Sequence, residues 1–215
     1  MQTRHRIVAT AAAAALAAGP AALALTPTAS AAAPKPTSLA DVLLADTKNG
    51  SPSFDKNGKD FDILTAAVLA VLKAKPKSPV SVLTKANVKL TAFIPTDAAF
   101  ERTAKAALGI TAKREARVAN RLVAKLGVNG VEKVLLYHVV AGKRITAKMA
   151  AASDGAHLTT ALGQSFRVDV RKGGIFLVDK VPAVRNPKVV VTDINKAPQN
   201  VQIAHAINRV LLPAL

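Results

Sequence analysis

The chain has 215 residues, and its 30 Lys and Arg outnumber its 13 Asp and Glu, which gives a formal charge of +17. This length fits one domain or at most two small ones. The chain contains no Cys, which excludes thiol chemistry and Cys-bound metals. The aromatic content is 3%, with no Trp, so few rings could stack on bases and we expect no nucleic-acid partner.

Residues 1–31 have the organisation of a secretory signal peptide. A basic start is followed by an apolar run rich in Ala and Leu, and Ala29-Ser30-Ala31 supplies the small residues of a cleavage site. Cleavage removes two basic residues and no acidic one, which lowers the formal charge from +17 to +15. We therefore expect a secreted, extracellular protein that can associate with the cell wall.

The remaining chain divides into a tether and a domain. Residues 32–37 contain Pro34 and Pro36 and are expected to form a short, extended Pro/Ala tether. Residues 38–213 show no internal repeat and no sign of a second domain, so we expect a single domain and a monomer. After the signal peptide, no segment is long and apolar enough to be a transmembrane candidate.

Apolar residues at helical spacing predict helices in the first half of the domain. Ser38 can cap the first helix, and turn residues make residues 49–60 a polar loop. Residues 61–72 have the strongest 3.6-residue pattern. Later helices are predicted over residues 114–126 and 130–136.

Residues 91–100 combine a strand with the start of a helix. Residues 91–94 favour a buried strand, which must end at Pro95 because proline cannot donate to the ladder. Thr96 and Asp97 can accept hydrogen bonds from the first free N–H groups of the next helix. Phe100 would then fold back onto the end of the strand.

Strands are predicted to dominate the second half of the domain. Residues 137–140 form the first, and residues 166–170 alternate between apolar and charged side chains as a half-buried strand does. Gly173-Gly174 can turn this strand into a hairpin partner. Further strands are predicted over residues 189–192 and 201–207. Helices followed by antiparallel strands indicate the α+β class.

Four basic residues recur at spacings of three and four and are expected to share the outer face of one predicted helix: Arg114, Arg117, Arg121 and Lys125. Such a stripe could bind a polyanion, and anionic wall polymers or acidic polysaccharide are the extracellular candidates. The plainer interpretation is a solvated face that keeps a secreted domain soluble. Both interpretations stay open at this point.

The chain lacks the sequence patterns of common catalytic and metal sites. It has no Gly-x-Ser-x-Gly turn, no phosphate-binding Gly-x-x-x-x-Gly-Lys loop and no His-Glu-x-x-His motif. His138 and His205 lie in apolar predicted strands and are expected to be hydrogen-bonded structural histidines. Asp60, Asp62 and Asp193 flank predicted elements as caps or loop residues. We therefore expect no catalytic residue, no cofactor and no metal site.

Three segments resemble the signatures of the fasciclin domain family, in the same order. The first signature, Thr-x-Phe-x-Pro-Thr-x-x-Ala-Phe, is matched at Thr91, Phe93, Pro95, Thr96, Ala99 and Phe100. The second is the pair Tyr137-His138 within residues 136–143. The third runs from His205 through Asn208 to Pro213 and is similar to His-x-Ile-Asp-x-Val-Leu-x-Pro.

The resemblance implies an α+β fold, a β-wedge of antiparallel strands with a helical layer packed against it. Two departures from the family pattern occur near the closing signature. Val201-Gln202 stand where the family usually has Asn-Gly, and Asn208 stands where it has Asp. The missing carboxylate is expected to have had a local hydrogen-bonding role.

Fasciclin domains are associated with cell adhesion and matrix contact without enzymatic activity. The resemblance therefore implies a secreted, non-enzymatic adhesion protein whose partner is a cell-surface or matrix macromolecule. Some members bind integrins through an Asp-Ile pair before the closing signature, and Asp193-Ile194 lies in the corresponding region. Asp193 could instead simply end a strand and turn the chain.

Two other functions remain open at the level of sequence. The first is a basic envelope module that binds anionic cell-wall polymers or polysaccharide through the stripe of Arg and Lys. The second is a secreted small-ligand carrier or hydrolase, which would require a deep pocket that brings distant residues together.

Overall fold

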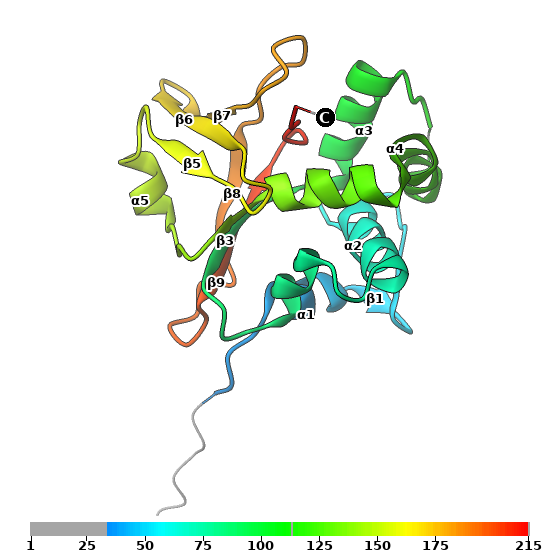
Figure 1. Ribbon diagram of the computed structural model, residues 1–215, viewed down its shortest axis with the longest axis horizontal. Coiled ribbons are helices and arrows are strands. Elements are labelled where there is room, and N and C mark those ends of the chain that lie inside the picture. Colours follow the sequence, from blue (N-terminus) through cyan, green and yellow to red (C-terminus); the bar gives the residue numbers. More distant parts are fainter. Residues whose placement is uncertain (1–33, 113, 215) are drawn as a thin grey trace, which may run out of the picture. The chain divides into compact units, whose positions relative to one another are not determined.

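Helices dominate the first half of the described chain and strands the second half, which confirms the predicted α+β class (Figure 1). The structure is a computed structural model that describes residues 34–112 and 114–214. The predicted signal peptide and the first two residues of the predicted tether lie outside these residues. Within the described ranges, no helix combines the length and the apolar character needed to cross a bilayer.

The helices are α1 Leu39–Leu44, α2 Asp62–Ala74, the 3₁₀ helix η1 Pro79–Thr84, α3 Asp97–Leu108, α4 Glu115–Tyr137 and α5 Ala147–Ala151. α4 is broken at Gly127, whose φ of 65° lies in the left-handed region that glycine adopts at little cost. This break confirms the predicted division of the region into two helical segments. The second segment continues through Tyr137, so the prediction of a strand that begins at Tyr137 is wrong.

The strands are β1 Thr47–Lys48, β2 Ser51–Pro52, β3 Leu90–Pro95, β4 Val139–Ala141, β5 His157–Thr159, β6 Ser165–Arg171, β7 Gly174–Val178, β8 Val189–Ile194 and β9 Gln202–Ile207. β1 and β2 form a small hairpin, and the other strands form two sheets, ordered β4-β3-β9-β8 and β5-β6-β7. The paired strands are antiparallel except β3 and β9, which are parallel. The prediction of antiparallel strands is therefore wrong at the centre of the larger sheet, where a long crossover joins the two strands.

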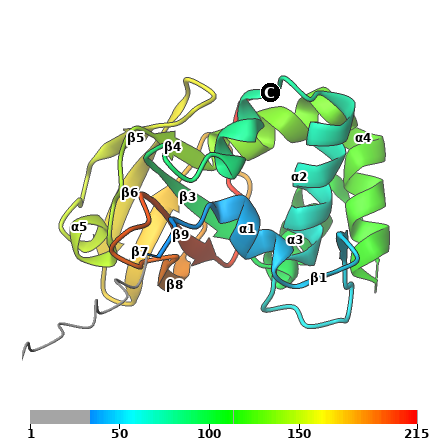
Figure 2. The ribbon, with the colours of Figure 1, turned by 90° about the horizontal axis from the view of Figure 1, so that it is seen from below.

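The larger sheet lies between two clusters of buried side chains. On one side, Ala92 and Ile94 of β3 pack with α1 to α4, and we call this cluster the helix-side core. On the other side, Phe93 of β3 and Ile207 of β9 pack against β6 and β7, and we call this cluster the strand-side core. Figure 2 shows α1 to α4 on one side of β3 and β9, and the smaller sheet together with α5 on the other side. Because both faces are covered, β3 and β9 are buried along their whole length.

The corner between β3 and α3 forms as predicted, except that Asp97 does not cap α3. Pro95 is the last residue of β3, and Thr96 caps α3 by accepting a hydrogen bond from the N–H of Ala99 at 3.3 Å. Phe100 is buried in the helix-side core. The corner therefore directs α3 away from the sheet and into the helical layer.

Candidate functional site

His138 joins the end of α4 to the C-terminal segment. Its Nδ1 lies 2.7 Å from the carbonyl oxygen of Val134, and its Nε2 accepts a hydrogen bond from the N–H of Leu211 at 2.9 Å. These two bonds require the tautomer that carries its proton on Nδ1. Burial lowers the pKa of His138 to about 4, so the ring is neutral at pH 7. It lies at the cap of a helix and not in the predicted strand, since the second segment of α4 extends to Tyr137.

His205 and Tyr137 are also held by backbone groups. His205 Nε2 lies 2.8 Å from the carbonyl oxygen of Ile145, and its Nδ1 accepts from the N–H of Asp193 at 3.3 Å. Burial lowers the pKa of His205. The Tyr137 hydroxyl donates to the carbonyl of Ser165 at 3.2 Å, and burial raises the pKa of Tyr137 to about 12. This geometry agrees with the structural roles predicted for these signature residues.

The Asp193-Ile194 pair is anchored within the fold. Asp193 has a φ of 58°, and its Oδ1 accepts a hydrogen bond from the N–H of Ala147 at 2.7 Å, at the start of α5. Ile194 is half-buried and packs against the helix-side core. The carboxylate thus already has a partner inside the protein, which favours the turn-forming interpretation. A role of this pair in partner binding stays a prediction.

The four basic residues of the predicted stripe are all exposed: Arg117, Arg121 and Lys125 lie on the first segment of α4, and Arg114 is its N-cap residue. We call this set the basic stripe. Arg121 Nη1 donates to the carbonyl of Thr111 at 2.8 Å, while the ion pairs formed by described residues lie in other parts of the chain. Glu115, the acidic residue of this segment, is only 4% exposed. The basic stripe therefore presents its positive charges to solvent without an acidic neighbour on the same helical segment.

A cluster of acidic side chains, which sequence analysis missed, lies where the loop before α2 meets α3 and α4. Asp60, Asp97 and Glu115 bring carboxylate oxygens within 4.8 Å of one another. Both carboxylate oxygens of Asp60 are buried. The three residues come from three elements far apart in the chain, and no sequence spacing connects them. The cluster becomes apparent only in the folded structure, where the N-terminal ends of α2, α3 and α4 lie together.

Asp97 and Glu115 hold backbone N–H groups, whereas the two buried carboxylate oxygens of Asp60 have no hydrogen-bond partner among the described residues. Asp97 accepts hydrogen bonds from the N–H groups of Asp62 and Ile63 at 3.0 and 2.9 Å. It therefore caps α2, and the prediction that it caps its own helix is wrong. Asp62 in turn accepts from the N–H groups of residues 53–54. Burial, with the neighbouring Asp60, raises the pKa of Asp97 to about 8. Such oxygens suit hard cations, and the bonds of Asp97 and Glu115 to the backbone also give these two residues a structural role.

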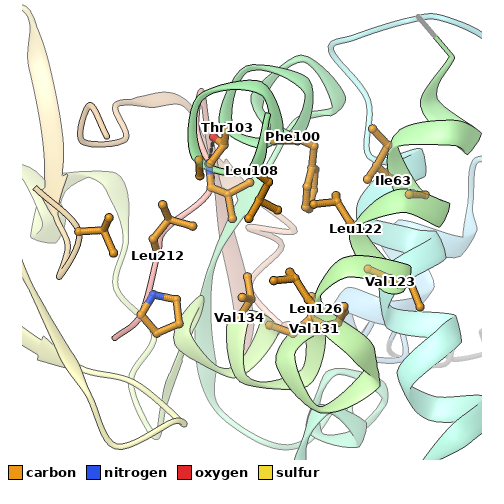
Figure 3. Close-up of a pocket in the computed structure, with 18 of the residues that line it drawn as sticks. Ile63, Phe100, Thr103, Leu108, Leu122, Val123, Leu126, Val131, Val134 and Leu212 are labelled. Atoms are coloured by element: carbon orange, nitrogen blue, oxygen red, sulfur yellow. Dashed lines mark hydrogen bonds between the residues drawn. The ribbon is translucent and has the colours of Figure 1, made fainter. Parts of the chain in front are cut away.

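The helix-side core borders an apolar cavity of about 310 Å³ that is partly open to the surface. Figure 3 shows side chains from α3, from α4 and from the C-terminal segment around one space, among them Phe100, Leu122 and Leu212. Of the described lining residues, Thr103 alone has a polar side chain, and its hydroxyl accepts a hydrogen bond from the N–H of Val210 at 3.0 Å. The lining of the cavity is therefore suited to an apolar ligand or side chain.

Sequence periodicity predicted some of the residues that line this cavity, but it did not predict the cavity. Leu122, Val123 and Leu126 are predicted on the inward face of their helix, and all three line the cavity. The pattern could not show that the opposing helix presents small residues such as Ala104 and Ala107. Those small side chains leave the space open.

Comparison with known proteins agrees with the three signatures. The family model of the fasciclin domain matches residues 64–213. The chain belongs to the fasciclin domain family. Fasciclin domains are linked in general to cell adhesion and occur in extracellular or adhesion proteins. No curated protein matches the chain.

One solved structure similar to this fasciclin domain is a FAS1 domain pair from the insect cell adhesion molecule Fasciclin I. The two sequences are 16% identical and the TM-score is 0.48. The match covers 83% of this chain and 51% of the solved chain. The chain thus spans about half the length of that structure.

Proposed function

We propose that this fasciclin domain is a secreted, non-enzymatic adhesion protein that contacts an anionic cell-surface or matrix macromolecule through the basic stripe. The observation that carries the proposal is the exposure of all four cations, three of them on the first segment of α4 and Arg114 at its N-cap. A local positive field of this kind attracts polyanions, and anionic wall polymers and acidic polysaccharide are such partners outside a cell. Family membership supplies the adhesive setting.

The state of the histidines supports binding rather than hydrolysis. A general base must reach the proton that it abstracts, and its ring nitrogen must be available. In His138 and His205, both ring nitrogens are occupied by backbone groups. The described arrangement therefore favours a protein that holds its partner without transforming it.

Retention of the purified mature protein on washed cell envelope tests the proposal. Retention should be strong at about 0.02 M salt and weak at about 0.5 M, because added ions screen exposed charges. The double variant Arg117→Glu, Arg121→Glu should lose about tenfold or more of its low-salt affinity, since each basic residue near an anionic surface contributes about 1 kcal/mol.

A matched variant separates the basic stripe from net charge. Lys148 in α5 and Lys172 in the β6–β7 turn are exposed and lie outside the helical layer. The double variant Lys148→Glu, Lys172→Glu makes the same change in net charge and should keep most of the affinity. Equal losses in the two double variants would reject the basic stripe as the contact. Salt-resistant retention would also reject it and would direct attention to Asp193-Ile194.

A further inference from the structure

The cavity in the helix-side core is large for a protein interior. Native interiors hold few voids larger than a water molecule, and each void forfeits contacts between its lining atoms. An apolar cavity of about 150 Å³ already binds a small hydrocarbon such as benzene. The volume here, about 310 Å³, is twice that size and falls at the lower limit of small-molecule sites.

The lining selects an aliphatic occupant. Apart from Thr103, whose hydroxyl is engaged by the N–H of Val210, the described lining side chains are apolar. A water molecule inside would find few of the two to four polar partners that it needs. Phe100 is the one aromatic side chain in the described lining, so the walls offer little stacking surface to a flat ring system. Branched aliphatic and alanine side chains instead suit a flexible hydrocarbon chain.

The cavity reaches the protein surface between α3 and the first segment of α4. Ala107 is exposed, and Leu108, Leu122 and Val123 are only half-buried, although all four line the cavity. An occupant could therefore leave one end in water while its chain lies among the buried lining residues.

The exposed charges beside this mouth are positive. Lys105 precedes the lining residue Leu108 by three positions in α3, and Lys125 follows the lining residue Leu122 by three positions in α4. Residues three apart are neighbours on a helix surface. Both lysines are exposed, whereas Asp97 and Glu115 of the same helices are buried and Glu101, one turn before Lys105 in α3, is half-buried. An anionic end group at the mouth would meet complementary charge.

We propose that the cavity binds the hydrocarbon chain of a free, single-chain anionic amphiphile of the fatty-acid type, with its carboxylate at Lys105 and Lys125. A methylene group fills about the volume of one liquid water, ~30 Å³, so the cavity accommodates roughly ten methylenes. The identity of this ligand is inferred from the cavity and its flanking charges. The inference does not depend on contact between the basic stripe and a polymer.

Calorimetric titration of the purified mature protein with saturated fatty acids of about six to sixteen carbons tests the proposal, with each acid below its micelle-forming concentration. Affinity should rise about fourfold for each added methylene, as expected for complete burial. The rise should stop at roughly ten methylenes, when the cavity is full. No binding, or an affinity that does not depend on chain length, would overturn the proposal.

The end group is tested with alkyl chains of equal length that carry an alcohol or a trimethylammonium group. The fatty acid should bind most tightly and the cationic amphiphile least tightly. The double variant Lys105→Glu, Lys125→Glu should remove this preference and keep the dependence on chain length. The double variant Lys148→Glu, Lys172→Glu, which makes the same change in net charge outside the helical layer, should preserve the preference. Tighter binding of the cationic amphiphile by the unmodified protein would overturn the assignment of the end group.

Filling the cavity gives an independent test. Ala104 and Ala119 are buried and line the cavity, so Ala104→Leu and Ala119→Leu, made separately, should each shorten the longest chain that still gains affinity. The matched control Ala150→Leu enlarges a buried alanine of the strand-side core and should leave that limit unchanged. If a folded filling variant binds the whole series as the unmodified protein does, the occupied site lies elsewhere and the proposal fails.

Discussion

The two cores on either side of the larger sheet are packed in different ways. In the strand-side core, the ring of Phe166 meets Phe93 and Tyr137 edge-to-face, with centroids 5.4 and 6.1 Å apart and interplanar angles of 88° and 85°. In the helix-side core, small side chains such as Ala104 face aliphatic ones across the cavity. The comparison indicates that the two cores have different roles. The packed rings hold the strand-side core in one arrangement, whereas the small side chains between the helices leave space for a ligand.

Truncation of one large side chain in each core is the strongest test of whether the two cores differ in packing. Phe166 is 1% exposed and central to the strand-side core, so Phe166→Ala should lower the free energy of unfolding by about 3–5 kcal/mol. Leu122 is half-buried at the cavity, where truncation enlarges an existing space, and Leu122→Ala should cost about 1 kcal/mol or less. Denaturant unfolding of both variants measures the difference. Similar losses at the two sites would show that the cores are equally well packed.

The acidic cluster makes the free energy of unfolding depend on pH near neutrality. The pKa of Asp97 is raised from 3.8 to about 8, first by burial and then by Asp60. The folded state thus binds more protons than the unfolded state between these values. Protonated Asp97 therefore stabilises the folded state fully below pH 3.8, and this contribution is lost as the pH rises through about 8. Between these values the free energy of unfolding falls by at most about 1.4 kcal/mol per pH unit.

Replacement of Asp60 by a neutral residue should reduce this pH dependence. Asp60→Asn removes a negative charge beside Asp97, so the variant should be more stable than the unmodified protein at about pH 8 and should show a smaller slope. Unfolding measured between about pH 6.5 and 8 isolates the effect. Below pH 6.5 protonation of buried His138, whose pKa is lowered to about 4, opposes it. Glu101→Gln, on the same helix as Asp97, is the control and should keep the original slope. An unchanged slope in Asp60→Asn would exclude coupling between the two carboxylates.

Sequence analysis predicted the local features of the fold well. The strand that ends at Pro95, the Thr96 cap and the break at Gly127 each depend on a few neighbouring residues with defined backbone preferences. The strand over residues 166–170 is confirmed within β6, whose side chains alternate between buried and half-buried positions up to Val168.

Apart from the continuation of α4 to Tyr137, the features that sequence analysis missed depend on residues far apart in the chain. The parallel pairing of β3 with β9 joins Phe93 to His205 across a long crossover. Asp97 reaches a helix that begins 35 residues earlier, and the acidic cluster and the cavity form where separate helices meet. A local pattern states which side of a helix is apolar, but it does not state which neighbour covers that side or how completely.

Substitution of Asn208 tests the boundary between the two cores. This residue lies where β9 ends and the chain turns towards the helices. Its Oδ1 accepts a hydrogen bond from the N–H of Lys188 at 2.8 Å, and its own N–H donates to the carbonyl of Lys188 at 3.0 Å. An aspartate can accept the same bond, so Asn208→Asp should change the free energy of unfolding by less than about 0.5 kcal/mol. Asn208→Ala loses the acceptor and should cost about 1 kcal/mol.

The direction of the small Asn208→Asp effect is also informative. Arg102 of α3 donates from Nη1 to the carbonyl of Asn208 at 3.2 Å, so its guanidinium lies near the new carboxylate and should favour it slightly. Thermal unfolding at low and high salt would detect this contribution, because screening should remove it. Equal losses in the Asp and Ala variants would show that the amide group itself is required. The family's usual aspartate would then be incompatible with this junction, and the two cores would be joined here by a contact specific to this chain.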